Sequence, residues 1–275
     1  MEKPDINNYV KLNNKKFHYV IYGNKNKRTF LLIHGWSGSY ENFRTWVPIL
    51  AKKYRVVIPD LPGCNLSASL EGVHDLEAYS KFLKEFAMKL KMKNFCMGGI
   101  CSGASIVMEY AKRYPEDVKL LFLHTPPISP GTIKPLFKFE AAIARIPMLN
   151  LFVRYIRKNE AITSFYKKLF IDGFDVNPED DAVNMKNQKI ANHDASVQLI
   201  LDMTKKDYSD FLKALKIPIY VIITKNDALI DVKKVRKIVE KLPTVKLEVI
   251  EMGAHGWSDD FIERQNGILA KFFIN

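Results

Sequence analysis

The chain has 275 residues, of which 47% are hydrophobic and 26% are charged. This length and composition suffice for one sizeable core, and they predict a soluble globular protein of one domain, alone or with an insertion. The formal net charge is +12, but the lysines are scattered singly and in pairs rather than interleaved with aromatic residues in a stripe. The sequence therefore predicts a lysine-rich surface and no nucleic-acid partner.

Targeting and cofactor motifs are missing from the sequence. No run approaches the ~18 apolar residues of a membrane span, and the first residues lack the apolar segment of a secretory signal. Cys64, Cys96 and Cys101 are too few and too irregularly spaced for a disulfide framework or a zinc site. No dinucleotide-binding or Walker A pattern follows a strand. We therefore expect a cytoplasmic protein with free thiols, no metal and no cofactor.

Apolar runs of four to seven residues alternate with longer amphipathic segments along the chain. Residues 9–12 and 17–22, joined through Asn13-Asn14, predict an antiparallel hairpin because Asn tolerates the positive φ of a tight turn. The later elements follow the pattern of a mostly parallel central sheet with helices on both faces, an α/β fold. The predicted strands are 29–33, 55–58, 94–98, 118–124, 217–224 and 246–251, and the clearest helices are 78–90 and 102–114.

The alternation breaks once, after Pro126-Pro127, a pair that cannot continue a strand. The following segment has no convincing strand but has helix-like stretches at 136–145 and 182–201. We therefore predict an inserted helical cap at 128–207, within a core domain formed by 1–127 and 208–275.

One amphipathic face of the predicted cap is basic and apolar, and such a face suits contact with a membrane. More often such a face packs on its own domain, so we expect packing here and no stable membrane association. The apolar residues of this face are Leu136, Phe137, Phe139, Ile143, Ile146, Met148 and Leu151.

The strongest motif is the turn Gly99-Ile100-Cys101-Ser102-Gly103, which ends a strand and opens a helix. In a G-x-S-x-G elbow the central residue adopts a strained backbone, and a Gly two positions before and after avoids Cβ clashes. The central residue here is Cys101. Ser102 does not qualify, because Ile100 and Ala104 stand two positions away, but its backbone N–H at the helix N-terminus suits half of an oxyanion hole.

The second half of that oxyanion hole is expected from the loop after strand 29–33, which reads His34-Gly35-Trp36. Gly35 allows the backbone to turn so that the Trp36 N–H faces the same oxygen. His34 is a candidate base, but a histidine at this place more often makes local hydrogen bonds that shape the loop, and we prefer that interpretation.

A nucleophile needs a base and an orienting carboxylate, and the last third of the chain supplies both. Asp227 follows strand 217–224 and His255 follows strand 246–251. Carboxyl ends of parallel strands face one crevice, so both side chains are expected beside Cys101. Asp231 is a rival acid, although its position suits a helix start better. His124 ends a strand beside the same crevice.

These motifs together resemble the α/β-hydrolase superfamily, in its capped branch of esterases, lactonases and carbon–carbon bond hydrolases. The matching stretches are residues 34–36, 60–67, 99–103, Asp227 and 253–255, and the resemblance covers nearly the whole chain. It implies an α/β-hydrolase fold with the chain order nucleophile, acid, histidine. Asn65 replaces the second Gly of the family's D-x-x-G-x-G-x-S pattern, a change that an αL turn tolerates. Most members carry Ser at the position of Cys101. A Cys at this position resembles the G-x-C-x-G elbow of dienelactone hydrolases and polyhydroxyalkanoate synthases.

The sequence thus predicts a hydrolase of a carboxylic ester, lactone or thioester that uses Cys101, His255 and Asp227 and forms an acyl-cysteine intermediate. The substrate is expected to be a small acyl compound with an apolar part. Acyl transfer through the same intermediate, an inactive ligand-binding protein, and a Ser-to-Cys variant of a serine esterase remain open, and the oligomeric state is not indicated. The expected pocket residues are His34, Gly35, His124, Leu229 and Trp257.

Overall fold

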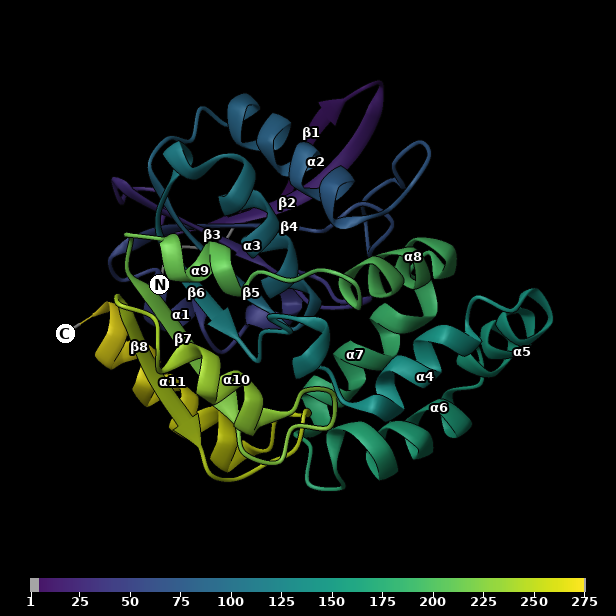
Figure 1. Ribbon diagram of the computed structural model, residues 1–275. Coiled ribbons are helices and arrows are strands. Elements are labelled where there is room, and N and C mark those ends of the chain that lie inside the picture. Colours follow the sequence, from purple (N-terminus) through teal and green to yellow (C-terminus); the bar gives the residue numbers. More distant parts are fainter. Residues whose placement is uncertain (1–4, 275) are drawn as a thin grey trace.

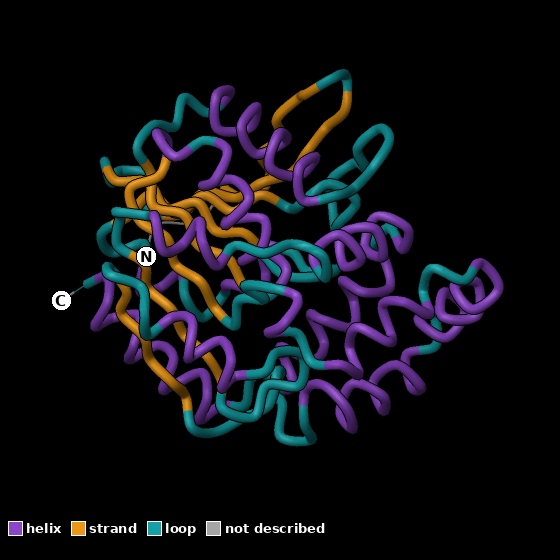
Figure 2. Tube along the Cα trace, viewed as in Figure 1, coloured by secondary structure: helices purple, strands orange, loops and turns teal. Residues whose placement is uncertain are grey.

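The computed structural model describes residues 5–274 and centres on one eight-stranded sheet (Figures 1 and 2). Residues 1–4, which begin the predicted core segment 1–127, and residue 275 lie outside the described part. The strand order is β1-β2-β4-β3-β5-β6-β7-β8. The two edge pairings β1–β2 and β2–β4 are antiparallel and all the others are parallel. The predicted fold class is confirmed.

The hairpin at the edge of the sheet follows from its turn residues. Strands β1 (Asp5–Leu12) and β2 (Lys15–Tyr22) pair through the turn at Asn13 and Asn14. These asparagines have φ values of 48° and 62°, the left-handed conformation that a two-residue hairpin turn requires.

The predicted parallel strands all form, with ends that shift by one or two residues. They are β3 (Arg28–Ile33), β4 (Tyr54–Pro59), β5 (Phe95–Ile100), β6 (Val118–His124), β7 (Ile219–Thr224) and β8 (Val245–Ile250).

Helices cover both faces of the sheet because the central strands are apolar on both sides. Along β3, Leu31 and Ile33 face one core, and Phe30 and Leu32 face the other. The first core is closed by α2 (Leu76–Lys89), α3 (Ser102–Arg113) and α10 (Val232–Val239), and the second by α1 (Val47–Leu50) and α11 (Asp259–Phe273). Short 3-10 turns occur at Tyr40–Phe43, Pro115–Asp117 and Pro130–Thr132.

Between β6 and β7 the chain is helical, as predicted, and contributes no strand to the sheet. The prediction of a single helix at 182–201 is wrong, because the helical conformation is interrupted at Ala191 and Asn192 and two helices form. Asn192 caps the second half by accepting a hydrogen bond from the Ala195 N–H at 3.1 Å. The predicted cap boundaries, 128 and 207, stay a prediction. The helices are α4 (Pro135–Ile143), α5 (Pro147–Arg157), α6 (Glu160–Lys167), α7 (Pro178–Ile190), α8 (His193–Met203) and α9 (Ser209–Ala214), with a π-helical turn at Lys168–Asp172.

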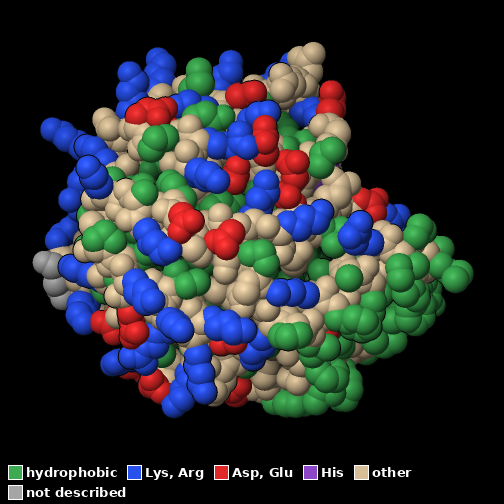
Figure 3. All heavy atoms as spheres, viewed as in Figure 1, with side chains coloured by type: hydrophobic (Ala, Val, Ile, Leu, Met, Phe, Trp, Pro, Cys, Tyr) green, Lys and Arg blue, Asp and Glu red, His purple; other side chains and the backbone are tan. Residues whose placement is uncertain are grey.

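The outer surface of α4 to α6 carries many uncovered apolar side chains (Figure 3). The expectation that this face packs on its own domain is wrong: Met148 is 79% exposed and Leu151 is 67% exposed, because these helices form the outermost layer (Figure 1). Of the predicted face only Phe137 and Ile143 line the internal cavity described below. Within residues 5–274 no helix combines the length and apolar character that crossing a bilayer requires. We call the following residues the exposed cap face: Leu136, Phe139, Ile146, Met148, Leu151, Phe152, Tyr155, Phe165 and Phe170.

Candidate active site

Cys101 lies in a strained turn between β5 and α3, as its flanking glycines predict. Its φ of 52° and ψ of −119° lie in a region that L-residues rarely occupy. A Cβ on Gly99 would come within 2.4 Å of the Gly103 carbonyl oxygen, and a Cβ on Gly103 within 2.4 Å of the His34 carbonyl oxygen. Both contacts are impossible, so only glycine allows the strand, the turn and the helix to meet here.

Asp227 and His255 come together from the loops after β7 and β8. His255 Nδ1 lies 2.8 Å from Asp227 Oδ2, and the carboxylate is fully buried. The other oxygen, Oδ1, accepts hydrogen bonds from the backbone N–H groups of Leu229 (2.8 Å) and Ile230 (2.9 Å). Burial alone would raise the pKa of Asp227, but His255 and these two N–H groups outweigh it and hold the pKa below its usual value.

His255 stands between this carboxylate and the Cys101 thiol. Burial alone would lower its pKa, but the charge and hydrogen bond of Asp227, together with Cys101, raise the pKa well above the usual histidine value. The charged imidazolium is therefore favoured between a carboxylate and a sulfur atom. Asp227 thus contacts one side of the imidazole, and Cys101 and His255 line the same cavity.

Asp231, the rival acid, is the N-cap of helix α10. Its side chain accepts a hydrogen bond from the Lys234 N–H at 3.2 Å and so caps the first turn of α10. This is the helix start that the sequence favoured.

A second buried His–Asp pair lies elsewhere, between His18 and Asp60, with Nδ1 2.7 Å from Oδ2. The other ring nitrogen of His18 lies 2.7 Å from the Ile6 carbonyl oxygen. Burial lowers the pKa of His18, but Asp60 and the carbonyl raise it by more. Since both nitrogens donate to acceptors, His18 has no free lone pair with which to take a proton.

The loop after β3 brings Gly35 and Trp36 next to the elbow. A Cβ built on Gly35 would touch the Cys101 Cβ at 3.4 Å, so the two backbones are in close approach. Within residues 5–274 the backbone N–H groups of Trp36 and Ser102 form no hydrogen bond. Two unpaired donors next to a nucleophile are what an oxyanion hole requires.

His34 holds this loop in shape. Its Nε2 accepts a hydrogen bond from the Leu61 N–H at 2.9 Å, so its Nδ1 donates to the Gly35 carbonyl at 2.8 Å. Burial lowers the pKa of His34, which keeps the ring neutral at pH 7. This arrangement agrees with the structural interpretation of His34.

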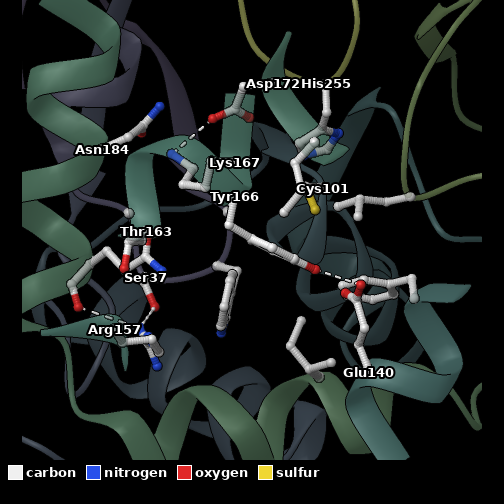
Figure 4. A pocket seen from close by; sticks show the side chains of 18 of the residues that line it. Ser37, Cys101, Glu140, Arg157, Thr163, Tyr166, Lys167, Asp172, Asn184 and His255 are labelled. Atoms are coloured by element: carbon white, nitrogen blue, oxygen red, sulfur yellow. Dashed lines mark hydrogen bonds and ion pairs between the residues drawn. The ribbon is translucent and has the colours of Figure 1, made fainter. Parts of the chain in front are cut away.

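A cavity of about 440 Å³ opens between the elbow and the cap (Figure 4). Gly35, Leu229 and Trp257 line it, together with Cys101 and His255, as predicted. Two further residues predicted for the pocket lie elsewhere. His34 and His124 do not line this cavity, because both are buried behind its wall.

His124 belongs to a buried network below the cavity. Trp46 Nε1–H donates to Gln265 Oε1 at 2.8 Å, so the Gln265 amide nitrogen faces His124 Nε2, also at 2.8 Å. The ring also packs against Trp257. Burial, reinforced by the nearby His255, lowers the pKa of His124 to about 3, so it carries no charge at pH 7.

The cap supplies the other half of the cavity wall, and the sequence did not predict these residues individually. Its inward side chains include apolar residues and about as many charged or polar ones. The sequence pattern does not distinguish these polar residues from polar residues that face solvent, because their burial depends on which cap helix packs over the core. The polar ones are Glu140, Arg157, Thr163, Tyr166, Lys167, Asp172, Asp180, Asn184, Gln188 and His193.

The remaining thiols and acidic groups offer no second centre. Burial raises the pKa of Cys64 to about 12 and that of Cys96 to about 11, so both are protonated and unreactive at pH 7. Among residues 5–274, no three side chains of His, Cys, Asp or Glu are grouped so that they could hold a metal ion.

The sheet order and the strained turn around Cys101 define an α/β enzyme with a nucleophile elbow, and comparison with known proteins agrees. Residues 28–260 match the family model described as alpha/beta hydrolase fold, and the chain belongs to this family. Lipase 1 of Psychrobacter immobilis is 36% identical over 110 residues, which make up 39% of this chain and only 34% of the lipase. The human monoacylglycerol lipase ABHD6 is 23% identical over 263 residues, covering 90% of this chain and 76% of that protein. An esterase from Thermogutta terrifontis has a TM-score of 0.79 at 20% identity and covers 96% of both chains.

Proposed function

We propose that the protein hydrolyses carboxylic esters, with Cys101 as the nucleophile, His255 as the base and Asp227 as the residue that orients the imidazole. The observation that carries the proposal is the pairing of His255 with a buried carboxylate in the same cavity that the elbow residue Cys101 lines. The similarity to lipases and esterases supports an ester as the substrate. Lactones and thioesters present the same type of carbonyl and belong to the same proposal.

The reaction has two steps. The Cys101 thiolate attacks the carbonyl carbon, and the oxyanion that forms accepts hydrogen bonds from the Trp36 and Ser102 N–H groups. The C–O bond to the alcohol breaks, the alcohol oxygen takes a proton from His255, and a thioester remains on Cys101. His255 then removes a proton from water, whose oxygen attacks the thioester carbon; the C–S bond breaks, which releases the acid and restores the Cys101 thiolate beside protonated His255.

The substrate is proposed to be a small molecule with an apolar part. Most of the cavity lining is apolar, with Phe137, Ile143, Val197 and Leu229 as examples, and such a surface favours an alkyl or aryl chain. The volume of about 440 Å³ is in the range of small-molecule sites.

The test uses p-nitrophenyl acetate and butyrate with mass spectrometry of the intact protein. We expect nitrophenol release and an acyl adduct on Cys101, and neither in Cys101→Ala. The absence of both turnover and adduct with all acyl lengths and lactones would replace this proposal with a ligand-binding function. Acylated products formed faster when amines, thiols or alcohols are added would replace it with acyl transfer.

A further inference from the structure

Arg157 is the last residue of α5 and points into the cavity, on the side opposite Cys101 and His255 (Figure 4). It is only 9% exposed. Its Nη1 donates to His193 Nδ1 at 2.8 Å, and its Nη2 donates to Ser37 Oγ at 3.0 Å and to the Gln188 carbonyl oxygen at 3.4 Å. Its buried Nε–H has no partner in the described part of the chain. The guanidinium is therefore held in place but not fully satisfied.

No carboxylate among residues 5–274 forms an ion pair with this guanidinium. Lys167, the other lysine or arginine among the described lining residues, differs: its Nζ lies 2.9 Å from Asp172. Arg44, which does not line the cavity, pairs with the carboxylate of the wall residue Asp180. Burying a guanidinium without a counter-charge is costly, because the charge loses its hydration and gains only neutral partners. Arg157 is therefore a cavity-lining cation without a carboxylate partner. Glu140 also lines the cavity and has no cationic partner among residues 5–274, but it accepts a hydrogen bond from the Tyr166 hydroxyl and lies on the other side of the cavity from Arg157 (Figure 4).

His193 does not supply a compensating charge. Burial, followed by the positive charges of Arg157 and Arg154, lowers the pKa of His193 to about 4. At pH 7 the ring is a neutral acceptor for Arg157. Burial also lowers the pKa of Arg157, to about 10, so the guanidinium keeps its charge at pH 7.

The position of Arg157 relates it to the reacting centre. Its guanidinium lies over the Trp36 ring, 4.9 Å from the ring centroid. Trp36 carries one of the two unpaired N–H groups beside Cys101. An acyl chain that extends from Cys101 along the cavity would end near Arg157.

We propose that Arg157 binds a carboxylate at the far end of the acyl chain, so that the preferred substrates are monoesters or monothioesters of dicarboxylic acids. One negative charge balances the one guanidinium that lacks a counter-charge. This inference rests on the proposed function, because it places the ester carbonyl at Cys101. It makes Arg157 a specificity residue rather than part of the chemical step.

The kinetic test compares two esters of equal size and shape, p-nitrophenyl hemiglutarate and p-nitrophenyl 5-methylhexanoate. They differ only in whether the chain ends in a carboxylate or in an isopropyl group. Arg157→Gln should lower the ratio of their kcat/KM values, anionic over neutral, by about 30-fold, the loss expected for one charge-assisted contact.

Arg154→Gln is the matched control. Arg154 lies on the same helix, 43% of its side chain is exposed, and it pairs with Asp194. The control removes the same formal charge from the solvent side, where screening is strong, and should change the ratio by less than about threefold. If Arg157→Gln lowers both kcat/KM values equally, Arg157 only ties the cap to the core and the inference is overturned.

A binding measurement separates this inference from the proposed function. Unreactive glutaramate should bind the unmodified protein at least about tenfold more tightly than 5-methylhexanamide, as measured by calorimetry. This comparison needs no variant, so it holds even if Arg157→Gln does not fold. Tighter glutaramate binding without ester turnover would sink the proposed function alone, whereas turnover with equal binding of the two amides would sink the anion site alone.

Discussion

Replacing Asp227 with Asn tests the arrangement of the site most directly, because it changes one atom of a fully buried group. Oδ1 of Asp227 accepts two backbone N–H groups, at 2.8 and 2.9 Å. In Asp227→Asn the amide oxygen must keep that place, since an NH₂ group there would face two donors. The NH₂ group then faces His255 Nδ1 and forces the ring proton onto Nε2. The nitrogen that should accept the thiol proton of Cys101 is thereby blocked.

The expected loss follows from this inverted tautomer. The same substitution in a Ser-His-Asp triad costs about 10⁴-fold in kcat. A thiol ionises more readily than a hydroxyl, so we expect a loss of about 10² to 10⁴-fold here, or about 3 to 5 kcal/mol of transition-state stabilisation. The assay is kcat for p-nitrophenyl butyrate, with circular dichroism to verify the fold.

Asp231→Asn is the matched control, because Asp231 caps α10 and does not contact His255. Asn is as good a cap as Asp, so kcat should change by less than about twofold and the free energy of unfolding by less than about 0.5 kcal/mol. If Asp231→Asn is the more damaging change, or if Asp227→Asn keeps more than a tenth of the activity, the assignment of the acid is wrong.

Three further outcomes are expected. At pH 7 iodoacetamide should alkylate Cys101 alone, since burial raises the pKa values of the Cys64 and Cys96 thiols to about 12 and about 11. His255→Ala should slow the alkylation of Cys101 at least about tenfold, and peptide mapping measures both outcomes. Folding lowers the pKa of Asp227, so the stabilisation that its carboxylate provides is lost as the pH falls through the pKa of the folded state. Folding raises the pKa of His255, so the stabilisation that its imidazolium provides is complete below about pH 6.5 and is lost as the pH rises through the pKa of the folded state. In urea unfolding, the free energy of unfolding of the wild type, relative to that of a variant in which Asp227 and His255 are both replaced, should accordingly fall on both sides of a window at about pH 4 to 6.5. If this difference does not change with pH, the assigned charges are wrong. On the exposed cap face, Met148→Ser and Leu151→Ser should each change the free energy of unfolding by less than about 0.5 kcal/mol, and a loss above about 2 kcal/mol would mean that these side chains are packed.

The sheet and the Cys101–His255–Asp227 constellation were readable from the sequence because their determinants are local. A hairpin turn needs residues that tolerate positive φ, and Asn13 and Asn14 supply it. The elbow needs glycines on both sides of one residue, which singles out Cys101 from Ser102. Parallel strands share one carboxyl edge, so residues that directly follow two such strands meet without any knowledge of the intervening loops.

Burial was decided by the tertiary structure, since it depends on what packs from elsewhere in the chain. Arg154 and Arg157 stand three residues apart on one helix, yet one faces solvent and the other lies buried in the cavity without a counter-charge. His34 and His124 follow or end strands at the crevice, as Cys101, Asp227 and His255 do, but both are buried, and His124 packs against Trp257 and the α11 residues Phe261 and Gln265. Met148 resembles a core residue in its amphipathic pattern, but it is 79% exposed, because no element within residues 5–274 covers it. Sequence therefore located the proposed reacting groups, and the packing of the cap over the core determined which other side chains line the cavity.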